Sequence, residues 1–344
     1  MMKKLKIGIL GAGFVQNFHM QSYKEIPNAD IVAVGAYEKE EVDVFSKKWN
    51  IPNSVFGEDA IEKLCSMKEI DAVCIGIPNE FHARAAKAAA ENGKHVICEK
   101  PLGRTAEEAK EMLDAVTKAG VIHCYAENQL FFPMYDYAFK AIENGAVGDV
   151  YWVRSREAHG GPHSLHFWKF GVGLDMGCHS VEVARRAFGN DTPVEVMMWG
   201  ETITHGDKTD AEDNCVILVK YKHGQLGQAE NSWSTRAGLD LRTEIYGKKG
   251  DIFMDNTRET GIKIFSTAGL GYVVEKAESD KGWMFPVPNE HVVYGYYDEL
   301  KHFVNCMIEG KEPTETFKDG VIVNAILDAG FKSMKEKKWI PVDL

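Results

Sequence analysis

The protein has 344 residues, of which 44% are hydrophobic and 26% are charged, and its formal net charge is −11. This balance is typical of a folded chain of about two domains and excludes a disordered or fibrous protein. The negative charge argues against a nucleic-acid or membrane-surface partner, because such partners need clustered Lys and Arg. No apolar run reaches the ~20 residues that a membrane span requires.

The seven cysteines are scattered and form no C-x-x-C pair. This spacing predicts neither a disulfide framework nor a structural zinc site. The N-terminus leads directly into a strand-like run, without the apolar core of a signal peptide. We therefore expect a reduced, cytoplasmic protein.

The first 125 residues alternate short apolar runs with helical patterns, which indicates a parallel sheet built from βαβ units. The expected strands cover residues 6–10, 31–36, 72–77, 95–98 and 121–125. Helices are expected over 80–92 and 106–119, and the second begins with a capping box of Thr105 and Glu108.

From residue 126 the pattern changes to consecutive strands without intervening helices, which indicates an antiparallel or mixed sheet. Strands are expected over 150–155, 194–199, 215–221, 225–233, 241–246 and 251–254. Helices are expected over 177–188, 297–309 and 319–335. The fold class is thus α/β: a Rossmann-type, doubly wound parallel sheet over 1–125, then an α+β domain over 126–344 on a large, mostly antiparallel sheet.

The first strand runs into Gly11-Ala-Gly13-Phe14-Val15-Gln16. Gly11 permits a tight turn, and Gly13 allows backbone N–H groups to approach a pyrophosphate at the start of a helix. This placement at the first βα junction predicts dinucleotide binding, the alternative being an ordinary tight turn. Gln16 stands where the third glycine of the fingerprint is expected, which predicts a wider packing of helix on strand.

Tyr37 and Glu38 follow the second expected strand. Glu38 can accept hydrogen bonds from the adenosine ribose, and its charge opposes a 2′-phosphate. Lys39 is the only cation beside it, so NAD is favoured over NADP. The alternative is that Glu38 opens a solvated acidic helix.

Two further motifs are suited to hydride chemistry. Lys100, in Glu99-Lys100-Pro101, follows a strand at the carboxyl edge, where open α/β sheets bind ligands. Asp175 and His179 are four residues apart, so a helical start places them on one face. A carboxylate beside an imidazole can orient it to take a proton from an alcohol. Taken alone, Lys100 would be interpreted as a surface residue before a helix. For the other pair, Asp175 as a helix N-cap and His179 as a satisfied polar residue is an equally good interpretation.

Together these segments resemble the glucose–fructose oxidoreductase/inositol dehydrogenase (Gfo/Idh/MocA) family. The resemblance rests on the glycine loop with His19, on Ile77-Pro78-Asn79 with His82, on residues 93–102, on Asp175-Met-Gly-Cys-His179, and on Glu299–Phe303 with Glu309–Pro313. It spans nearly the whole chain. It implies an open-faced second sheet, NAD(P)-dependent oxidation of a secondary alcohol on a sugar or cyclitol, and a homodimer or homotetramer joined through that sheet.

The resemblance also implies residue roles. Lys100 matches the catalytic lysine, Asp175 its acidic partner and His179 the proton-transfer histidine. The expected cofactor-binding residues are Gly11, Gly13, Phe14, Val15, Tyr37, Glu38, Pro78, Asn79, His82, Glu99 and Lys100. Two departures, Gln16 and Ala36-Tyr37, affect the pyrophosphate geometry and the choice between NAD and NADP.

Residues 157–169 are the most unusual segment, with three of the 12 histidines within eight residues. Their position between a strand and the Asp175 turn suggests a substrate-binding loop, in which an aromatic ring stacks on a sugar and polar groups bind its hydroxyls. The expected substrate-binding residues are Glu157, His159, His163, His166 and Trp168, with Asn128 from the domain junction. A metal site is the less favoured interpretation, because the proposed hydride transfer needs none. A polar loop without function, and for Asn128 a linker cap, are the plain alternatives.

The sequence therefore predicts an NAD-dependent dehydrogenase of carbohydrate metabolism, acting on a ring hydroxyl of a sugar, glycoside or cyclitol. Three alternatives stay open: an NADP-dependent sugar reductase, a redox-assisted glycosidase that retains NAD, and a non-catalytic sugar or NAD sensor. The retention of Lys100, Asp175 and His179 together argues against the sensor.

Overall fold

The computed structural model describes residues 4–162 and 167–344. The chain divides into two compact units, each assembled from two separate stretches of sequence. The first unit comprises Met1–Phe132 and His291–Asn324, and the second comprises Pro133–Glu290 and Ala325–Leu344. Each sheet of the predicted fold lies within one unit.

The first unit contains a six-stranded parallel sheet in the order β3-β2-β1-β4-β5-β6, which is the doubly wound order predicted from the sequence. Its strands are β1 (Leu5–Leu10), β2 (Ala29–Ala36), β3 (Asn53–Phe56), β4 (Ala72–Ile75), β5 (His95–Glu99) and β6 (His123–Ala126). The edge strand β3 was not expected, because its four residues are mostly exposed and carry little apolar pattern.

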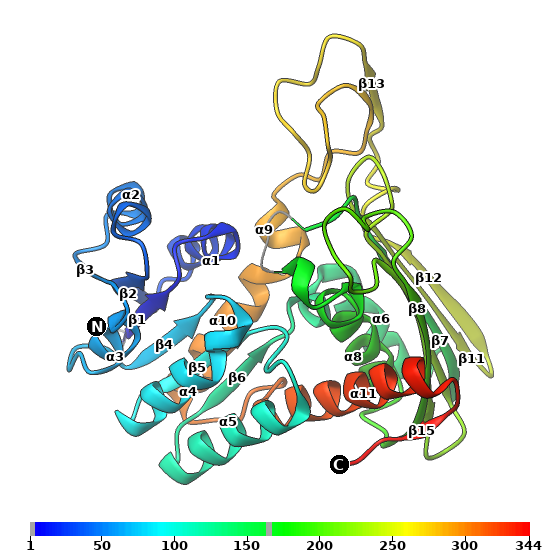
Figure 1. Cartoon of the computed structure of the whole chain (residues 1–344), viewed down its shortest axis with the longest axis horizontal. Helices are drawn as coiled ribbons and strands as arrows, with labels where there is room; N and C mark the ends of the chain where they lie inside the picture. The colour runs from blue at the N-terminus through cyan, green and yellow to red at the C-terminus, as the bar shows by residue number, and fades with distance from the viewer. Residues whose placement is uncertain (1–3, 163–166) are drawn as a thin grey trace. The chain divides into compact units, whose positions relative to one another are not determined.

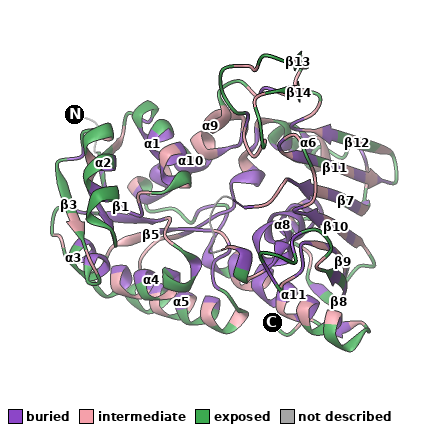
Figure 2. Cartoon of the chain, turned by 45° about the horizontal axis from the view of Figure 1, so that its top comes forward, coloured by how far each residue is buried: buried purple, intermediate pink, exposed green. Residues whose placement is uncertain are grey.

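Helices cover both faces of this sheet. They are α1 (Phe14–Glu25), α2 (Lys39–Trp49), α3 (Ala60–Cys65), α4 (His82–Glu91), α5 (Ala106–Ala119) and α10 (Tyr296–Glu309), with short turns η1 (Asn79–Phe81) and η2 (Asn128–Phe131). The predicted helix over 106–119 is confirmed, and Thr105 Oγ1 accepts the Glu108 N–H at 3.2 Å as its N-cap. In Figure 2 the strands β1 and β5 are buried, whereas α2 is largely exposed.

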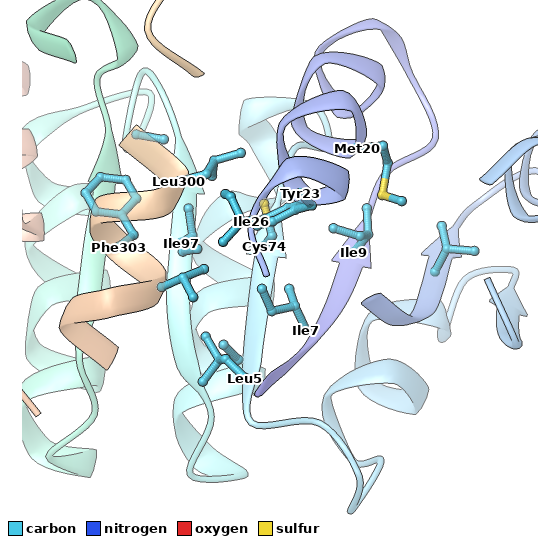
Figure 3. Packing of buried hydrophobic residues seen from close by; sticks show 14 of the residues in the cluster. Leu5, Ile7, Ile9, Met20, Tyr23, Ile26, Cys74, Ile97, Leu300 and Phe303 are labelled. Carbon is cyan, nitrogen blue, oxygen red and sulfur yellow. The ribbon is translucent and has the colours of Figure 1, made fainter. Parts of the chain in front are cut away.

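A buried hydrophobic core of this unit lies between the sheet and α1, α2 and α10. Alternate residues of β1, namely Leu5, Ile7 and Ile9, point into it, as the two-residue period of a strand requires. Leu300 and Phe303 come from α10, nearly 300 residues further along the chain, and are fully buried (Figure 3). Helix α10 is therefore an integral layer of the first unit.

The second unit contains a seven-stranded mixed sheet in the order β12-β11-β7-β10-β9-β8-β15. Its neighbours pair antiparallel except β10 with β7, which are parallel. The strands are β7 (Val150–Ala158), β8 (Pro193–Glu201), β9 (Asn214–Tyr221), β10 (Leu226–Ser232), β11 (Asp240–Gly247), β12 (Gly250–Asp255) and β15 (Ile340–Pro341). The predicted mostly antiparallel sheet is confirmed.

Helices and a small hairpin complete the second unit. Those that lie wholly within it are α6 (Pro133–Glu143), η3 (Phe167–Lys169), α7 (Val172–Asp175) and α8 (Gly177–Ala187), with the pair β13 (Ile264–Ser266) and β14 (Gly282–Met284). Helix α9 (Glu290–Val293) belongs to the first unit except for Glu290, and α11 (Phe317–Glu336) contributes residues up to Asn324 to the first unit and the rest to the second. The hairpin stands away from the seven-stranded sheet (Figure 1). Across the described residues, no helix is long and apolar enough to cross a membrane.

Candidate active site

The glycine turn has the geometry that the sequence predicts. Gly11 has a φ of +108°, and a Cβ there would lie 2.4 Å from the carbonyl oxygen of Gly76, so only glycine fits. A Cβ on Gly13 would meet nothing within 4 Å. Gly13 is the N-cap of α1 and supplies no side-chain hydrogen bond to the first N–H groups of the helix. This exposed helix start suits the pyrophosphate of a dinucleotide.

Gln16 occupies the position where a third glycine was expected. Its side chain is buried, and Nε2 donates to the Leu10 carbonyl at 3.1 Å. The opposite wall is Gly76, where a Cβ would lie 2.4 Å from Gln16 Nε2. A glycine in the neighbouring loop therefore makes room for the larger side chain, which hydrogen-bonds the end of β1.

The residues predicted to bind the adenosine ribose of the cofactor follow directly after β2. Tyr37 is 64% exposed, and Glu38 is exposed as the N-cap of α2. Lys39 is ion-paired with Asp43 and lies 5.5 Å from the ring centre of Phe56. The cation next to Glu38 is thus already engaged by another carboxylate.

Residues 99–103, here named the lysine loop, follow β5. Glu99 Oε2 accepts the Lys100 N–H at 3.1 Å, and Lys100 itself is half-buried. The Lys100–Pro101 peptide bond is cis. His82 is buried, with Nδ1 3.1 Å from the Pro101 carbonyl and Nε2 2.9 Å from the Ile77 carbonyl. Burial lowers the pKa of His82 although these carbonyls oppose the shift. The side chain of His82 thus joins the loops after β4 and β5.

Three other predicted residues lie on the same unit. Pro78 is exposed beside the turn η1, and Asn79 is buried within it. Asn128 is buried in η2, and its Nδ2 donates to the Tyr294 carbonyl at 2.8 Å. The amide of Asn128 therefore fastens the C-terminal stretch of this unit to the end of its sheet.

In the second unit, Asp175 ends α7 and His179 lies in the first turn of α8. The carboxylate of Asp175 is buried, and its Oδ2 accepts a hydrogen bond from Trp233 Nε1 at 3.3 Å. The Nε2 atom of His159 lies 4.0 Å from the same oxygen. The bond from Trp233 to Asp175 had no signal in the sequence, because 58 residues separate them.

His159 is buried, in contrast to the surface loop suggested by its Gly/Pro surroundings. Its Nδ1 accepts the Gly161 N–H at 3.0 Å. A ring nitrogen that accepts a hydrogen bond carries no proton, so the proton of His159 resides on Nε2, the atom that faces Asp175. His159 is thereby oriented toward the predicted catalytic carboxylate.

Two further predicted substrate residues, Glu157 and Trp168, are also buried. Glu157 is buried, and its Oε1 accepts from Ser180 Oγ at 3.1 Å. Trp168 packs edge-on against Trp233, with ring centres 5.1 Å apart. Trp168 is only 7% exposed, so little of its indole face is open for stacking on a sugar ring. His163 and His166 lie outside the described residues.

Glu212 holds the turn that carries Asp175, and sequence reasoning missed it. Its Oε1 accepts the Gly173 N–H at 3.0 Å, and a Cβ on Gly171 would lie 2.3 Å from the same oxygen. Burial raises the pKa of Glu212 to about 7, although the Gly173 N–H opposes the shift. The buried carboxyl of Glu212 thus holds α7 by a hydrogen bond to its backbone.

A glycine turn that opens a helix on a parallel sheet, with a lysine after β5, defines a dinucleotide-binding oxidoreductase. Residues 5–127 match the family model described as the oxidoreductase family with an NAD-binding Rossmann fold. Residues 140–343 match that family's C-terminal alpha/beta domain. The chain belongs to this family, Gfo/Idh/MocA, as its motifs suggest.

Several relatives match over almost their full length. The chain is 27% identical to a Thermotoga maritima myo-inositol 2-dehydrogenase, covering 98% of this chain and 99% of the relative. It is also 27% identical to a levoglucosan dehydrogenase of Pseudarthrobacter phenanthrenivorans, with 99% of each covered. Among solved structures, a levoglucosan dehydrogenase in complex with NADH has a TM-score of 0.83 and 25% identity, covering 99% of this chain and 100% of that one. GenD2 from gentamicin A biosynthesis, in complex with NAD, has a TM-score of 0.92 at 22% identity, covering 100% and 98%, and shows the likeness of fold.

Proposed function

We propose that this oxidoreductase is an NAD-dependent dehydrogenase that oxidises a ring hydroxyl of a sugar or cyclitol. The observation that carries the proposal is the buried Asp175 carboxylate, which Trp233 binds and His159 faces, four residues before His179. Such a fixed carboxylate and imidazole are the groups that proton removal from an alcohol requires. The names of the relatives, which are inositol, levoglucosan and apiose dehydrogenases, support this substrate class.

Each predicted catalytic residue has a separate role in the proposal. Lys100 donates a hydrogen bond to the substrate hydroxyl, and its positive charge favours loss of the hydroxyl proton. His179 accepts that proton, and Asp175 stabilises the resulting imidazolium. Bound NAD supplies the hydride acceptor. Gly11 and Gly13 shape the turn at its pyrophosphate, with Phe14 and Val15 in the first turn of α1.

The residues after β2 support NAD over NADP. Glu38 presents a carboxylate where the adenosine ribose is expected, and Lys39 already pairs with Asp43. The 2′-phosphate of NADP would therefore meet the negative charge of Glu38, while the neighbouring cation, Lys39, is already paired with Asp43. We expect NADP to bind at least about 10-fold more weakly than NAD, a difference of roughly 1.4 kcal/mol.

The test is incubation with NAD and a panel of inositols, sugars and glycosides, with NADH absorbance as the readout. Lys100→Ala and His179→Ala should abolish NADH formation, whereas Lys118→Ala on the exposed end of α5 should not. Turnover that survives both active-site substitutions would refute the assigned roles. Glycoside cleavage without net NADH would identify the redox-assisted glycosidase instead, and tight binding without any turnover would identify a sensor.

Association through the seven-stranded sheet and a cytoplasmic location are further parts of the proposal. Aromatic side chains gather on β7, β11 and β12, where Trp152 contacts Tyr246 and Tyr246 contacts the 67% exposed Phe253. Such an aromatic surface suits a homodimer or homotetramer. The seven cysteines are free thiols, as a reducing compartment favours. Light scattering after gel filtration and cell fractionation test the two statements.

A further inference from the structure

A buried group of ionisable residues lies behind the lysine loop in the first unit. His19 comes from α1, Glu99 from the end of β5 and Glu299 from α10, three segments that the sequence motifs single out but the proposed reaction does not use. His19 and Glu299 are fully buried, and Glu99 is nearly so. We refer to these three residues as the buried triad.

His19 and Glu99 form an ion pair. His19 Nε2 lies 2.9 Å from Glu99 Oε1, and His19 Nδ1 lies 3.3 Å from Cys74 Sγ. Both ring nitrogens thus face atoms that can accept a hydrogen bond, as a doubly protonated imidazolium requires. Burial lowers the pKa of His19, but Cys74 and Glu99 outweigh it and raise the pKa to about 10. Burial also opposes ionisation of Glu99, but His19 and Lys100 hold its pKa below the usual range.

Glu299 faces this pair from α10. One turn earlier on the same helix, the ring of Tyr296 stacks on Phe18, with centres 5.1 Å apart, and contacts His19 at 5.6 Å. Residues three apart share a helix face, so Glu299 also points toward α1. Within residues 4–162 and 167–344, neither carboxyl oxygen of Glu299 has a hydrogen-bond partner. An ionised carboxylate buried in this way is very costly, so Glu299 retains its proton.

The electrostatic surroundings support this charge state. Burial, and then the negative charge of Glu99, raise the pKa of Glu299 well above its usual range. The ionisable groups that face Glu299 come from α1, β4, β5, β6 and the residue after β6: His19, Tyr23, Cys74, Glu99, Cys124 and Glu127. Two of these, Tyr23 and Cys74, belong to the same buried cluster as Leu300 of α10 (Figure 3). The triad as a whole then carries one positive and one negative charge.

The triad is connected to Lys100 through the backbone. One oxygen of Glu99 binds His19 and the other accepts the Lys100 N–H at 3.1 Å. The far end of the lysine loop is also fixed, since Asn324 Nδ2 donates to the Gly103 carbonyl at 2.8 Å and Gly103 N–H donates to Asn324 Oδ1 at 3.3 Å. The position of Lys100 therefore depends on how firmly Glu99 is held.

We propose that His19 and Glu299 are positioning residues for Lys100. Protonated His19 fixes ionised Glu99, Glu99 fixes the start of the lysine loop, and neutral Glu299 faces the pair without adding a second negative charge. The expected effect on turnover rests on the proposed function, whereas the stability and spectroscopic effects do not. The imidazole thereby couples helix α1, at the cofactor end, to the loop that carries the catalytic lysine.

The first experiment is a double-mutant cycle on thermal unfolding. His19→Gln leaves the Glu99 charge buried and should lower Tm by about 10 °C. Adding Glu99→Gln removes that charge, so the double variant should melt at least about 3 °C above His19→Gln. His223→Gln, which changes an exposed histidine paired with Asp191, is the control and should leave Tm unchanged. A double variant no more stable than His19→Gln would overturn the ion pair.

The second experiment observes Lys100 directly by NMR after methylation of the lysines with isotope-labelled formaldehyde. The Lys100 signal is the one that disappears in Lys100→Arg. It should shift or broaden in His19→Gln and Glu299→Ala, but not in Glu299→Gln, because an amide replaces the neutral acid in size and charge. Glu309→Gln, on the exposed end of α10, is the matched control. A Lys100 signal unmoved in His19→Gln would refute the positioning role, and loss of the native signal in Glu299→Gln would refute the neutral acid.

Kinetics add a readout that a purely structural role would not move. For folded His19→Gln we expect kcat to fall about 10-fold to 100-fold while KM for NAD stays within about 2-fold. Glu299→Gln should restore the kcat that Glu299→Ala loses. Unchanged kcat in His19→Gln contradicts the proposal. If the wild-type protein oxidises no sugar or cyclitol, the proposed function is wrong. The thermal unfolding measurements and the NMR signal of Lys100 still test whether His19 and Glu299 position Lys100.

Discussion

The indole N–H of Trp233 donates to Asp175 Oδ2 across 3.3 Å, so the residue after β10 orients a carboxylate on α7. The backbone carbonyl of Trp233 in turn lies 2.9 Å from His205 Nε2. Asp175 is thus fixed by side chains of the sheet and its loops, beyond its own helix. A fixed carboxylate loses less entropy when it acts on an imidazolium.

Removing this indole donor should slow the reaction. We expect Trp233→Phe to lower kcat roughly 10-fold, because Asp175 loses a hydrogen bond that sets its orientation. Steady-state kinetics with the best sugar or cyclitol of the panel measure the effect. Trp199→Phe, at a 46% exposed position on β8, is the control for loss of an indole. Equal kcat values for the two variants would contradict the role of Trp233.

His159 should contribute through its Nε2 proton, since Nδ1 is committed to the Gly161 N–H. We expect His159→Gln to reduce kcat/KM for the sugar about 10-fold. The affinity for NAD should remain unchanged, because the glycine turn after β1 is the expected pyrophosphate site and His159 is a predicted substrate residue. Isothermal titration with NAD, run beside the kinetics, separates the two effects. A large loss of NAD affinity in His159→Gln would show that His159 contributes to cofactor binding, which contradicts the prediction.

Glu212 predicts a specific dependence of stability on pH. Its pKa is about 7 in the folded protein, above the ordinary value of 4.5 that applies when the chain is unfolded. The folded state therefore holds the proton more tightly. The resulting stabilisation is complete below pH 4.5 and is lost as pH rises through about 7, by about 3 kcal/mol in total. Urea unfolding from pH 5 to pH 8.5 should show this decline.

Glu212→Gln should flatten that decline, since an amide cannot ionise and its oxygen still accepts the Gly173 N–H. Glu201→Gln, exposed on the neighbouring β8, should leave the wild-type pH dependence in place. If the stability of Glu212→Gln still falls between pH 5 and pH 8.5, the titration of another group causes the decline.

Gly13 and Gly11 should respond differently to substitution. Gly13→Val adds a side chain in open space, so Tm should change little while NAD affinity falls at least about 10-fold. Gly11→Ala forces a Cβ to within 2.4 Å of the Gly76 oxygen at a positive φ and should destabilise the fold itself. Thermal unfolding and NAD titration distinguish the two outcomes. Gly206→Val, at an equally open loop position, is the control.

The sequence was sufficient for the features that depend on local pattern. The parallel sheet, the capping of α5 by Thr105 and the glycine turn follow from periodicity and from residues a few positions apart. The start of α8 two residues before His179 was also predictable. In each case the neighbours that determine the structure are adjacent in the chain.

The missed features depend on contacts between distant residues. Trp233 meets Asp175 across 58 positions, and Glu212 meets Gly173 across 39. The burial of His159 was not predicted, because Gly160, Gly161 and Pro162 are residues typical of a surface loop. In the structure β7 pairs with β10 and β11 up to Ala158, and His159, the next residue, is buried. Only the folded topology brings such pairs together.

The placement of α10 in the core of the first unit also constrains synthesis. When a ribosome has released residues 1–132, the inner face of the six-stranded sheet still lacks Leu300, Phe303, Val304 and Met307. The nascent chain must keep this apolar surface from aggregating until some 170 further residues have emerged. The nucleotide-binding half, although encoded first, is completed almost last, so a chain truncated before residue 290 should depend on chaperones and be degraded rapidly.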